Sequence, residues 1–129
     1  MSSPEQTFED FVDENLETEL GQNAKSNSAV ICLAAPGNVV IYASDAFEAH
    51  TGYAPSEALG RNMNFLQGPD TEPDAVAQFR HLIETGTSGT VTITNYRKDG
   101  TSFLHECEFR PVRNEEGVVT HFVTIQRPL

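Results

Sequence analysis

Residues 60–68 read Gly-Arg-Asn-Met-Asn-Phe-Leu-Gln-Gly, and the chain on either side of them shows the patterns of regular structure. Three segments on the C-terminal side have the composition and length of strands: residues 89–98, 101–112 and 118–126. Asp99-Gly100 joins the first two segments and is a strong hairpin signal. Because Asn114 to Gly117 forms the next turn, the chain is expected to end in three antiparallel strands.

A helix is predicted between residues 60–68 and these strands. Thr71 and Asp74 resemble a capping box at its start, and Pro73 lies in its first turn. Gly86 is expected to end it. Its apolar face is formed at helical spacing by Val76, Phe79, Leu82 and Ile83.

On the N-terminal side, residues 29–34 and 39–42 predict two short strands around a turn at Pro36-Gly37-Asn38. Ser44 is expected to cap a short helix that runs through His50 and stops at Gly52. Another helical turn, Pro55 to Leu59, is closed by Gly60. This order of elements predicts an α+β domain, in which short helices pack on one face of a five-stranded antiparallel sheet.

The first twenty residues predict an amphipathic helix. Ser3, Pro4 and Gln6 supply an N-cap, a first-turn proline and a capping-box partner. Its apolar stripe consists of Phe8, Phe11, Val12, Leu16 and Leu20. Gly21 is expected to stop the helix, and residues 22–28 to form a polar linker. The chain thus divides into a helix and linker, residues 1–28, and a core, residues 29–127.

The last strand bears on assembly, because both of its faces carry apolar residues. Val123 and Ile125 share one face, and Phe122, Thr124 and Gln126 share the other. Both faces are therefore expected to be covered, although the short helices can cover only one. The N-terminal helix is the expected second cover, either from the same chain or, in a homodimer, from a partner.

Composition excludes several classes of function. The 129 residues carry a net charge of −11, from 8 basic and 19 acidic side chains, and form one domain. Such a chain lacks the basic footprint for nucleic acid and for anionic membranes. It contains no apolar stretch of membrane-spanning length and no leader pattern, so a cytoplasmic protein is expected. Neither an enzyme nor a metal protein is expected, since no motif places a nucleophile with a base or histidines at metal spacing. Cys32 and Cys107 are expected to be buried free thiols.

Residues 60–68 resemble the signature of light-oxygen-voltage (LOV) domains of the PAS superfamily, Gly-x-Asn-Cys-Arg-Phe-Leu-Gln. Asn95 to Gly100 resembles the family's strand-turn segment, and Phe103 and Pro111-Val112 follow at its spacing. Gln126 stands where the family has its flavin-contacting glutamine. The likeness runs from about Ala29 to Gln126, and it implies the PAS fold and bound FMN, with riboflavin or FAD as alternatives.

The resemblance also implies which residues contact the flavin. A flavin needs apolar walls for its ring, amides for its pyrimidine edge, and cationic or amide donors for its phosphate. Asn95, His105 and Gln126 are expected at the pyrimidine edge, and Asn62, Gln67 and Arg80 at the ribityl chain and phosphate. The remaining expected cofactor-binding residues are Val30, Cys32, Asn38, Met63, Leu66, Val76, Phe79, Ile83, Cys107, Phe109, Phe122 and Thr124.

The chain departs from the family pattern at three positions. Met63 replaces the photoreactive cysteine, and a thioether has no transferable proton for the family's thiol–flavin bond. It is interpreted as an apolar filler, with a methionine–flavin product or an engineered change as alternatives. Asn64 replaces one of the family's two phosphate-binding arginines. His105 stands where a second asparagine is usual, either as a satisfied pocket residue or as a group that tunes the flavin. His50, His81 and His121 are interpreted as surface or edge residues.

Three hypotheses of function follow. The first is a flavin-binding blue-light sensor without an adduct, which responds by photoreduction to a neutral radical or only fluoresces. Its electron donors would be tyrosines, Tyr42, Tyr53 or Tyr96, because the chain has no tryptophan. The second is a redox-sensing or flavin-storage domain for which light is incidental. The third is a PAS dimerisation module. No output domain is expected within the chain, so it is either a short receptor or part of a longer one.

Overall fold

The computed structural model describes residues 8–129, so the predicted cap at Ser3, Pro4 and Gln6 lies outside the described residues. The helices are α1 (Phe8–Asn15), α2 (Thr18–Ser26), α3 (Ala46–Thr51), α4 (Pro55–Ala58), the 3-10 turn η1 (Met63–Leu66) and α5 (Pro73–Thr85). The strands are β1 (Ser28–Leu33), β2 (Val40–Ala43), β3 (Gly89–Tyr96), β4 (Ser102–Arg113) and β5 (Val119–Pro128).

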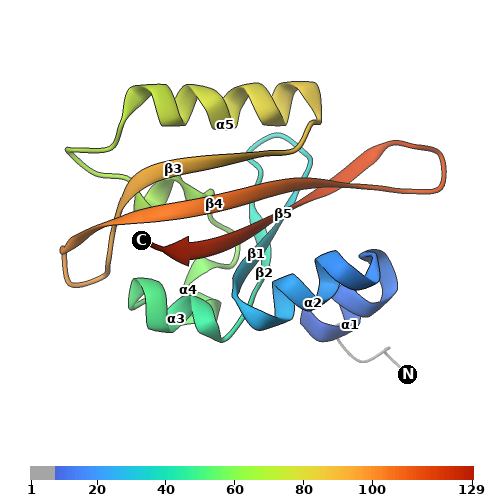
Figure 1. Ribbon diagram of the computed structural model, residues 1–129, viewed down its shortest axis with the longest axis horizontal. Coiled ribbons are helices and arrows are strands. Elements are labelled where there is room, and N and C mark those ends of the chain that lie inside the picture. The colour runs from blue at the N-terminus through green and yellow to red at the C-terminus, as the bar shows by residue number, and fades with distance from the viewer. Residues whose placement is uncertain (1–7) are drawn as a thin grey trace.

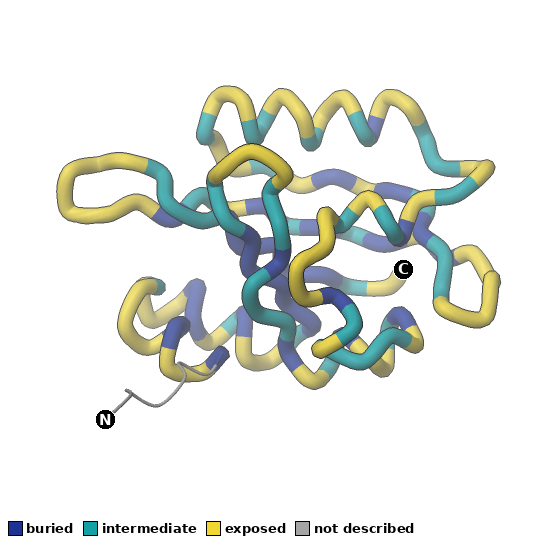
Figure 2. The backbone as a smooth tube through the Cα atoms, turned by 180° about the vertical axis from the view of Figure 1, so that it is seen from behind, coloured by how far each residue is buried: buried dark blue, intermediate teal, exposed yellow. Residues whose placement is uncertain are grey.

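The five strands form one antiparallel sheet in the order β2-β1-β5-β4-β3, with α5 on one side and α1 and α2 on the other (Figure 1). The predicted fold class is therefore confirmed. The turns follow the expected chemistry, because Gly52 and Gly86 end α3 and α5 with φ of 78° and 62°, where a side chain would be strained. Buried positions are concentrated along the central strands and the inner sides of the helices (Figure 2).

The N-terminal segment differs from the prediction. There are two helices rather than one, and α2 runs through Gly21 and most of the expected linker. A Cβ on Gly21 would lie 3.0 Å from Cγ1 of Val12, so this glycine allows the two helices to approach closely. Within α2, Ala24 is fully buried, and Lys25 forms an ion pair with Asp13 of α1 at 2.6 Å. Packing thus makes a helix from a segment whose polar composition favoured a linker.

The two helices cover the outer face of the sheet, and we call them the N-terminal cap. Phe8, Phe11 and Val12 of α1 pack with Ile31, Val123 and Ile125 of the sheet in one buried cluster. The ring of Phe11 lies 4.8 Å from that of His121, edge to face. The expectation that both faces of β5 are covered is confirmed, and here the cover comes from the same chain. His121 is half-buried in this contact rather than a simple surface residue.

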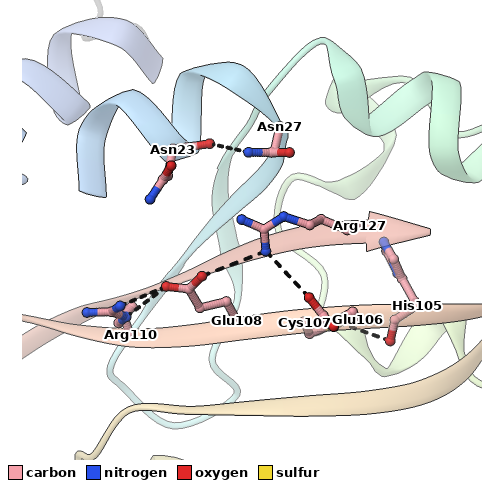
Figure 3. Close-up of polar contacts among 8 residues, drawn as sticks. All are labelled: Asn23, Asn27, His105, Glu106, Cys107, Glu108, Arg110 and Arg127. Carbon is pink, nitrogen blue, oxygen red and sulfur yellow. Dashed lines mark hydrogen bonds and ion pairs between the residues drawn. The ribbon is translucent and has the colours of Figure 1, made fainter. Parts of the chain in front are cut away.

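Beyond the cap, the outer face of the sheet is polar. Arg127 on β5 lies 3.7 Å from carboxylate oxygens of both Glu106 and Glu108 on β4, and Arg110 pairs with Glu108 at 2.9 Å (Figure 3). Figure 3 also shows Asn27, which donates to the carbonyl of Asn23 at the end of α2. Half-exposed ion pairs of this kind remain hydrated, so the part of the outer face that the cap does not cover is compatible with exposure to solvent.

Two predicted helix caps are wrong, because their hydroxyls bond elsewhere. Ser44 accepts a hydrogen bond from the backbone N–H of Ala29 at 2.8 Å and so ties α3 to β1. Thr71 donates to the carbonyl of Thr94 at 2.7 Å, on the edge strand β3. Both helices start without a side-chain cap bond. A serine or threonine hydroxyl serves a cap or a strand equally well, and tertiary contacts decide which.

Candidate functional site

One cavity lies between the inner face of the sheet and the segment η1 with α5. It holds about 700 Å³ of empty space when the open space at its mouth is included. Its lining consists of Cys32, Asn38, Asn62, Met63, Asn64, Leu66, Gln67, Phe79, Ile83, Ile93, Asn95, Cys107, Phe109, Phe122, Thr124 and Gln126. We call it the central cavity.

Alternation along the strands brings the inner wall together. Cys107 on β4 pairs with Gln126 on β5, which in turn pairs with Ser28 on β1. One register step away, Phe109 pairs with Thr124. Residues that pair across neighbouring strands point to the same face of the sheet. The side chains of these paired residues therefore form one wall of the cavity.

Aromatic side chains close one end of the cavity. Phe109 and Phe122 stack at 4.8 Å with an interplanar angle of 24°, and Phe79 of α5 meets Phe109 edge to face at 6.0 Å. Leu66 of η1 is buried on the opposite side, beside the half-buried Met63. The cavity thus has apolar walls that can hold a flat ring.

The polar part of the wall presents an acceptor and a donor. The Asn95 Nδ2 group bonds to Nδ1 of His105 at 3.0 Å, which leaves Oδ1 for the cavity. Ser28 Oγ donates to Oε1 of Gln126 at 3.0 Å, which leaves the Nε2 donors. Asn95 and Gln126 are 5% and 2% exposed, so a ligand edge that pairs with them is shielded from water.

Amide side chains also surround the mouth of the cavity. Asn62 donates to the carbonyl of Gly37 at 2.9 Å and accepts from the N–H of Asn64 at 2.9 Å, so it fixes the turn and η1 together. Asn38 adopts a left-handed φ of 43° in that turn and donates to the carbonyl of Leu33. Gln67 is exposed at the same rim.

Four of the residues expected at the site lie outside the lining. Val30 is buried in the core beside the cavity, and Val76 packs one turn earlier on α5 against β3 and β4. Arg80 is exposed on the surface of α5. His105 lies behind Asn95 rather than at the cavity surface. Their predicted contacts with a cofactor stay predictions.

Asn64 and Ile93 are lining residues that were not among the expected contacts listed above. The sequence nevertheless indicates Ile93 as an apolar wall residue, because it shares its strand face with Asn95. Asn64 follows Met63 in η1 and lies at the mouth, where the resemblance implies a phosphate-binding arginine in other members of the family.

Both cysteines line the cavity and are buried free thiols, as expected. Burial raises the pKa of the Cys32 and Cys107 thiols to about 12. Neither side chain therefore supplies a thiolate near neutral pH. Figure 3 shows Cys107 beside the carbonyl of His105, at 4.0 Å from sulfur to oxygen.

The three tyrosines lie in different surroundings. Tyr53 meets Phe65 edge to face at 5.1 Å and packs in the same cluster as Met63. Tyr96 covers Gly68, where a Cβ would clash with its ring, and its hydroxyl accepts from the N–H of Asp70. Tyr42 instead belongs to the cap cluster, 5.3 Å from Phe11 on the outer side of the sheet.

No helix within residues 8–129 combines the length and apolar character needed to cross a membrane.

Comparison with known proteins places this geometry in a family. The PAS domain family matches residues 27–127. A blue-light photoreceptor of Listeria monocytogenes is 44% identical over 90 residues, and phototropin-2 of Oryza sativa is 43% identical over 91 residues. Each match covers 70% of this chain but only 35% and 10% of the relative, so the chain spans a minor part of these proteins.

Solved structures agree over most of the chain. A light-oxygen-voltage domain studied with a flavin analogue has a TM-score of 0.81 and 38% identity, covering 88% of this chain and 87% of its own. The dark structure of the Aureochrome1 LOV domain has a TM-score of 0.81 and 30% identity, covering 100% and 87%. The chain therefore belongs to the PAS domain family and, within it, to the light-oxygen-voltage domains.

Proposed function

We propose that this domain binds a flavin in the central cavity and senses blue light. The observation that carries the proposal is the buried wall in which the Asn95 acceptor and the Gln126 donors lie between apolar surfaces. A flavin pyrimidine edge alternates donors and acceptors beside a flat ring, so this wall is complementary to it. FMN is the proposed cofactor, with riboflavin and FAD as alternatives.

Riboflavin is expected to compete well with FMN. Asn64 offers an amide at the mouth where the family has an arginine, and Arg80 would have to reach a phosphate from outside the lining. An amide forms a weaker hydrogen bond to phosphate than a guanidinium does. The two flavins should therefore differ little in affinity.

We further propose that the light response does not use a thiol bond. Met63 lines the cavity and, by the family resemblance, stands in place of the reactive cysteine, whereas Cys32 and Cys107 lie on β1 and β4 and not in η1. Bound flavin supplies blue-light absorption and a site that accepts one electron and one proton. The chain would supply the electron from a tyrosine.

Tyr53 is the proposed electron donor, because it packs against the same buried cluster as Met63, whereas Tyr42 lies on the other side of the sheet. In the Tyr53→Phe variant, photoreduction without added reductant should slow by roughly tenfold, the factor that corresponds to ~1.4 kcal/mol of barrier. Tyr42→Phe is the matched control and should keep the rate. The measurement is the loss of blue absorbance under constant illumination. Equal rates in both variants would remove Tyr53 from the mechanism.

We propose that Gln126 transmits the light-induced change from the cavity to the N-terminal cap through its hydrogen bond with Ser28. The Ser28 hydroxyl binds Oε1 of Gln126, and Ser28 lies directly between α2 and the body of β1. Removal of this hydroxyl in Ser28→Ala should reduce light-induced change in the cap at least twofold while the photochemistry persists. Hydrogen exchange of α1 and α2, in the dark and in light, is the measurement. Gln126→Leu should abolish the change, and an unaltered response in that variant would disprove the route.

The experiment that tests the function is an absorption spectrum of the purified protein in the dark and after blue light. Three vibronic bands in the blue are expected, replaced on illumination by a broad absorption at longer wavelength. A colourless protein that added FMN does not restore would overturn the proposal. Light that leaves hydrogen exchange unchanged while chemical reduction alters it would favour the redox-sensing alternative.

A homodimer remains a separate proposal. The outer-face residues Ile31, Val123 and Ile125 are covered by the cap alone, so a displaced cap would expose an apolar surface for a second copy. Light scattering during chromatography, in the dark and in light, measures the mass. A monomer under both conditions would leave the cap as a purely intramolecular cover.

A further inference from the structure

Two buried side-chain nitrogens in residues 8–129 have no hydrogen-bond partner, and they belong to neighbouring histidines. These are Nδ1 of His50 on α3 and Nε2 of His105 on β4. The two rings meet edge to face with centroids 6.0 Å apart. Buried polar atoms are almost always bonded, so such a pair calls for an explanation. His50 is thus not the simple surface residue that the sequence suggested.

The bond between Asn95 and His105 fixes the proton on the histidine ring. An amide Nδ2 can only donate, so Nδ1 of His105 is the acceptor at 3.0 Å. The neutral ring must then carry its hydrogen on Nε2. Because His105 holds the nitrogen end of the amide, Asn95 presents its oxygen to the central cavity.

A proton on Nδ1 of His105 would reverse this arrangement. The imidazolium Nδ1–H would then face another donor, and the amide would have to rotate by half a turn to offer its oxygen. The cavity wall would show the Asn95 donors beside those of Gln126, where it now shows an acceptor beside a donor. A ligand edge matched to the first pattern would lose a hydrogen bond in the second.

The surroundings keep His105 neutral at physiological pH. Burial, with the positive charges of His50 and Arg97, lowers the pKa of His105 to about 4. Burial and Arg97 also lower the pKa of His50 below 6.5. Arg97 lies over Phe103 at 4.3 Å, and that ring contacts His105 at 4.9 Å.

The other charged groups on this side are already paired or carry no charge. Lys98, beside α3, forms an ion pair with Glu57 at 2.6 Å. The buried residue on β5, Gln126, has no ionisable group. As the pH falls, His105 is protonated in the unfolded chain near pH 6.5 but in the folded chain only near pH 4. The free energy of unfolding therefore decreases between about pH 6.5 and pH 4.

We propose that His105, backed by His50, is a positioning residue that orients the Asn95 amide and thereby sets the flavin-matching pattern of the cavity wall. The inference rests on the proposed flavin function. It gives His105, which lies behind the cavity wall, a role in ligand selection. His105 does not line the cavity, so its effect on binding passes through Asn95.

The first test needs no cofactor. Nitrogen-15 NMR of the flavin-free protein at pH 7 should show His105 as the neutral tautomer with hydrogen on Nε2 and an unprotonated Nδ1. A proton on Nδ1 at that pH would overturn the proposal, whatever the variants do. This result is independent of whether any flavin binds.

The second test compares riboflavin affinities by quenching of flavin fluorescence. His105→Phe removes the acceptor and should weaken binding about tenfold, whereas His105→Asn restores an acceptor oxygen and should bind within about twofold of the parent. His121→Phe changes a ring on the outer face and is the matched control, with unchanged affinity. Equal binding by His105→Phe and the parent would contradict the inference.

The pH profile separates positioning from general packing. Parent affinity should hold from pH 7 to about 5 and fall about twofold by pH 4, while His105→Asn stays flat over that range. Parallel profiles for the two proteins would overturn the inference. A parent protein that binds no riboflavin at pH 7 would instead refute the proposed function, and the NMR result would still stand.

Discussion

Replacement of Phe11 by alanine should cost about 3–5 kcal/mol of unfolding free energy, the usual range for a buried phenylalanine. Phe11 is 3% exposed and lies between two elements, 5.3 Å from the ring of Tyr42 and 4.8 Å from that of His121. The neighbouring side chains are already packed in the same buried cluster, so the space left by the ring would not close fully. Urea unfolding measures the effect.

Leu104→Ala is the matched control. Leu104 lies on the same outer face but beyond the cap and is 47% exposed, so its loss should change stability by at most about 0.5 kcal/mol. If Phe11→Ala cost no more than this control, the cap would not be packed on the sheet in solution. The route proposed from Gln126 through Ser28 to the cap would then have nothing to act on.

The sheet could be predicted because local chemistry and tertiary structure agree there. Asp99-Gly100 permits one tight turn, and the alternation of Cys107 and Phe109 with charged residues allows one face to be buried. The same alternation places Asn95 and Gln126 on one face of the sheet, and both side chains line the cavity. A register error of one residue would have exposed all of them, so this part of the prediction was strongly constrained.

The N-terminal segment and the cap hydroxyls could not be predicted in the same way. Gly21 is a plausible helix stop in sequence, and only its contact with Val12 reveals a close helix crossing. Ser44 and Thr71 had reasonable local roles, but strands distant in sequence offered better partners. Wherever two roles are nearly equal in energy, the choice depends on contacts that no local window contains.

Within the site, the expected residues that lie outside the cavity lining have a common explanation. Helical spacing gave one apolar face to α5, yet only Phe79 and Ile83 reach the cavity, and Val76 lies one turn too early. The helical spacing of apolar residues identifies the buried face of α5, but it does not show which part of that face a ligand would contact. His105 lies on the strand face that was expected, but its ring lies behind Asn95 and does not line the cavity.

Replacement of Met63 by cysteine should convert the proposed photochemistry from electron transfer to the thiol reaction of the family. Met63 begins η1 and lines the central cavity, and η1 is held in place by Asn62. The shorter side chain fits the same space and supplies the transferable proton that a thioether lacks. Blue light should then bleach the three-banded absorption within seconds, without reductant, and the bands should return in the dark.

Met63→Leu is the control, since it keeps an apolar side chain of similar volume and adds no thiol. It should retain the slow, donor-dependent response of the parent protein. Thiol chemistry elsewhere is tested by adding Cys107→Ser, which should leave the new bleaching intact because Cys107 lies on β4 and not at position 63 of η1. If Met63→Cys bound flavin but responded to light as the parent does, residue 63 would not lie against the reactive part of the ring. The proposed orientation of the flavin, with its pyrimidine edge at Asn95 and Gln126, would then have to be reversed.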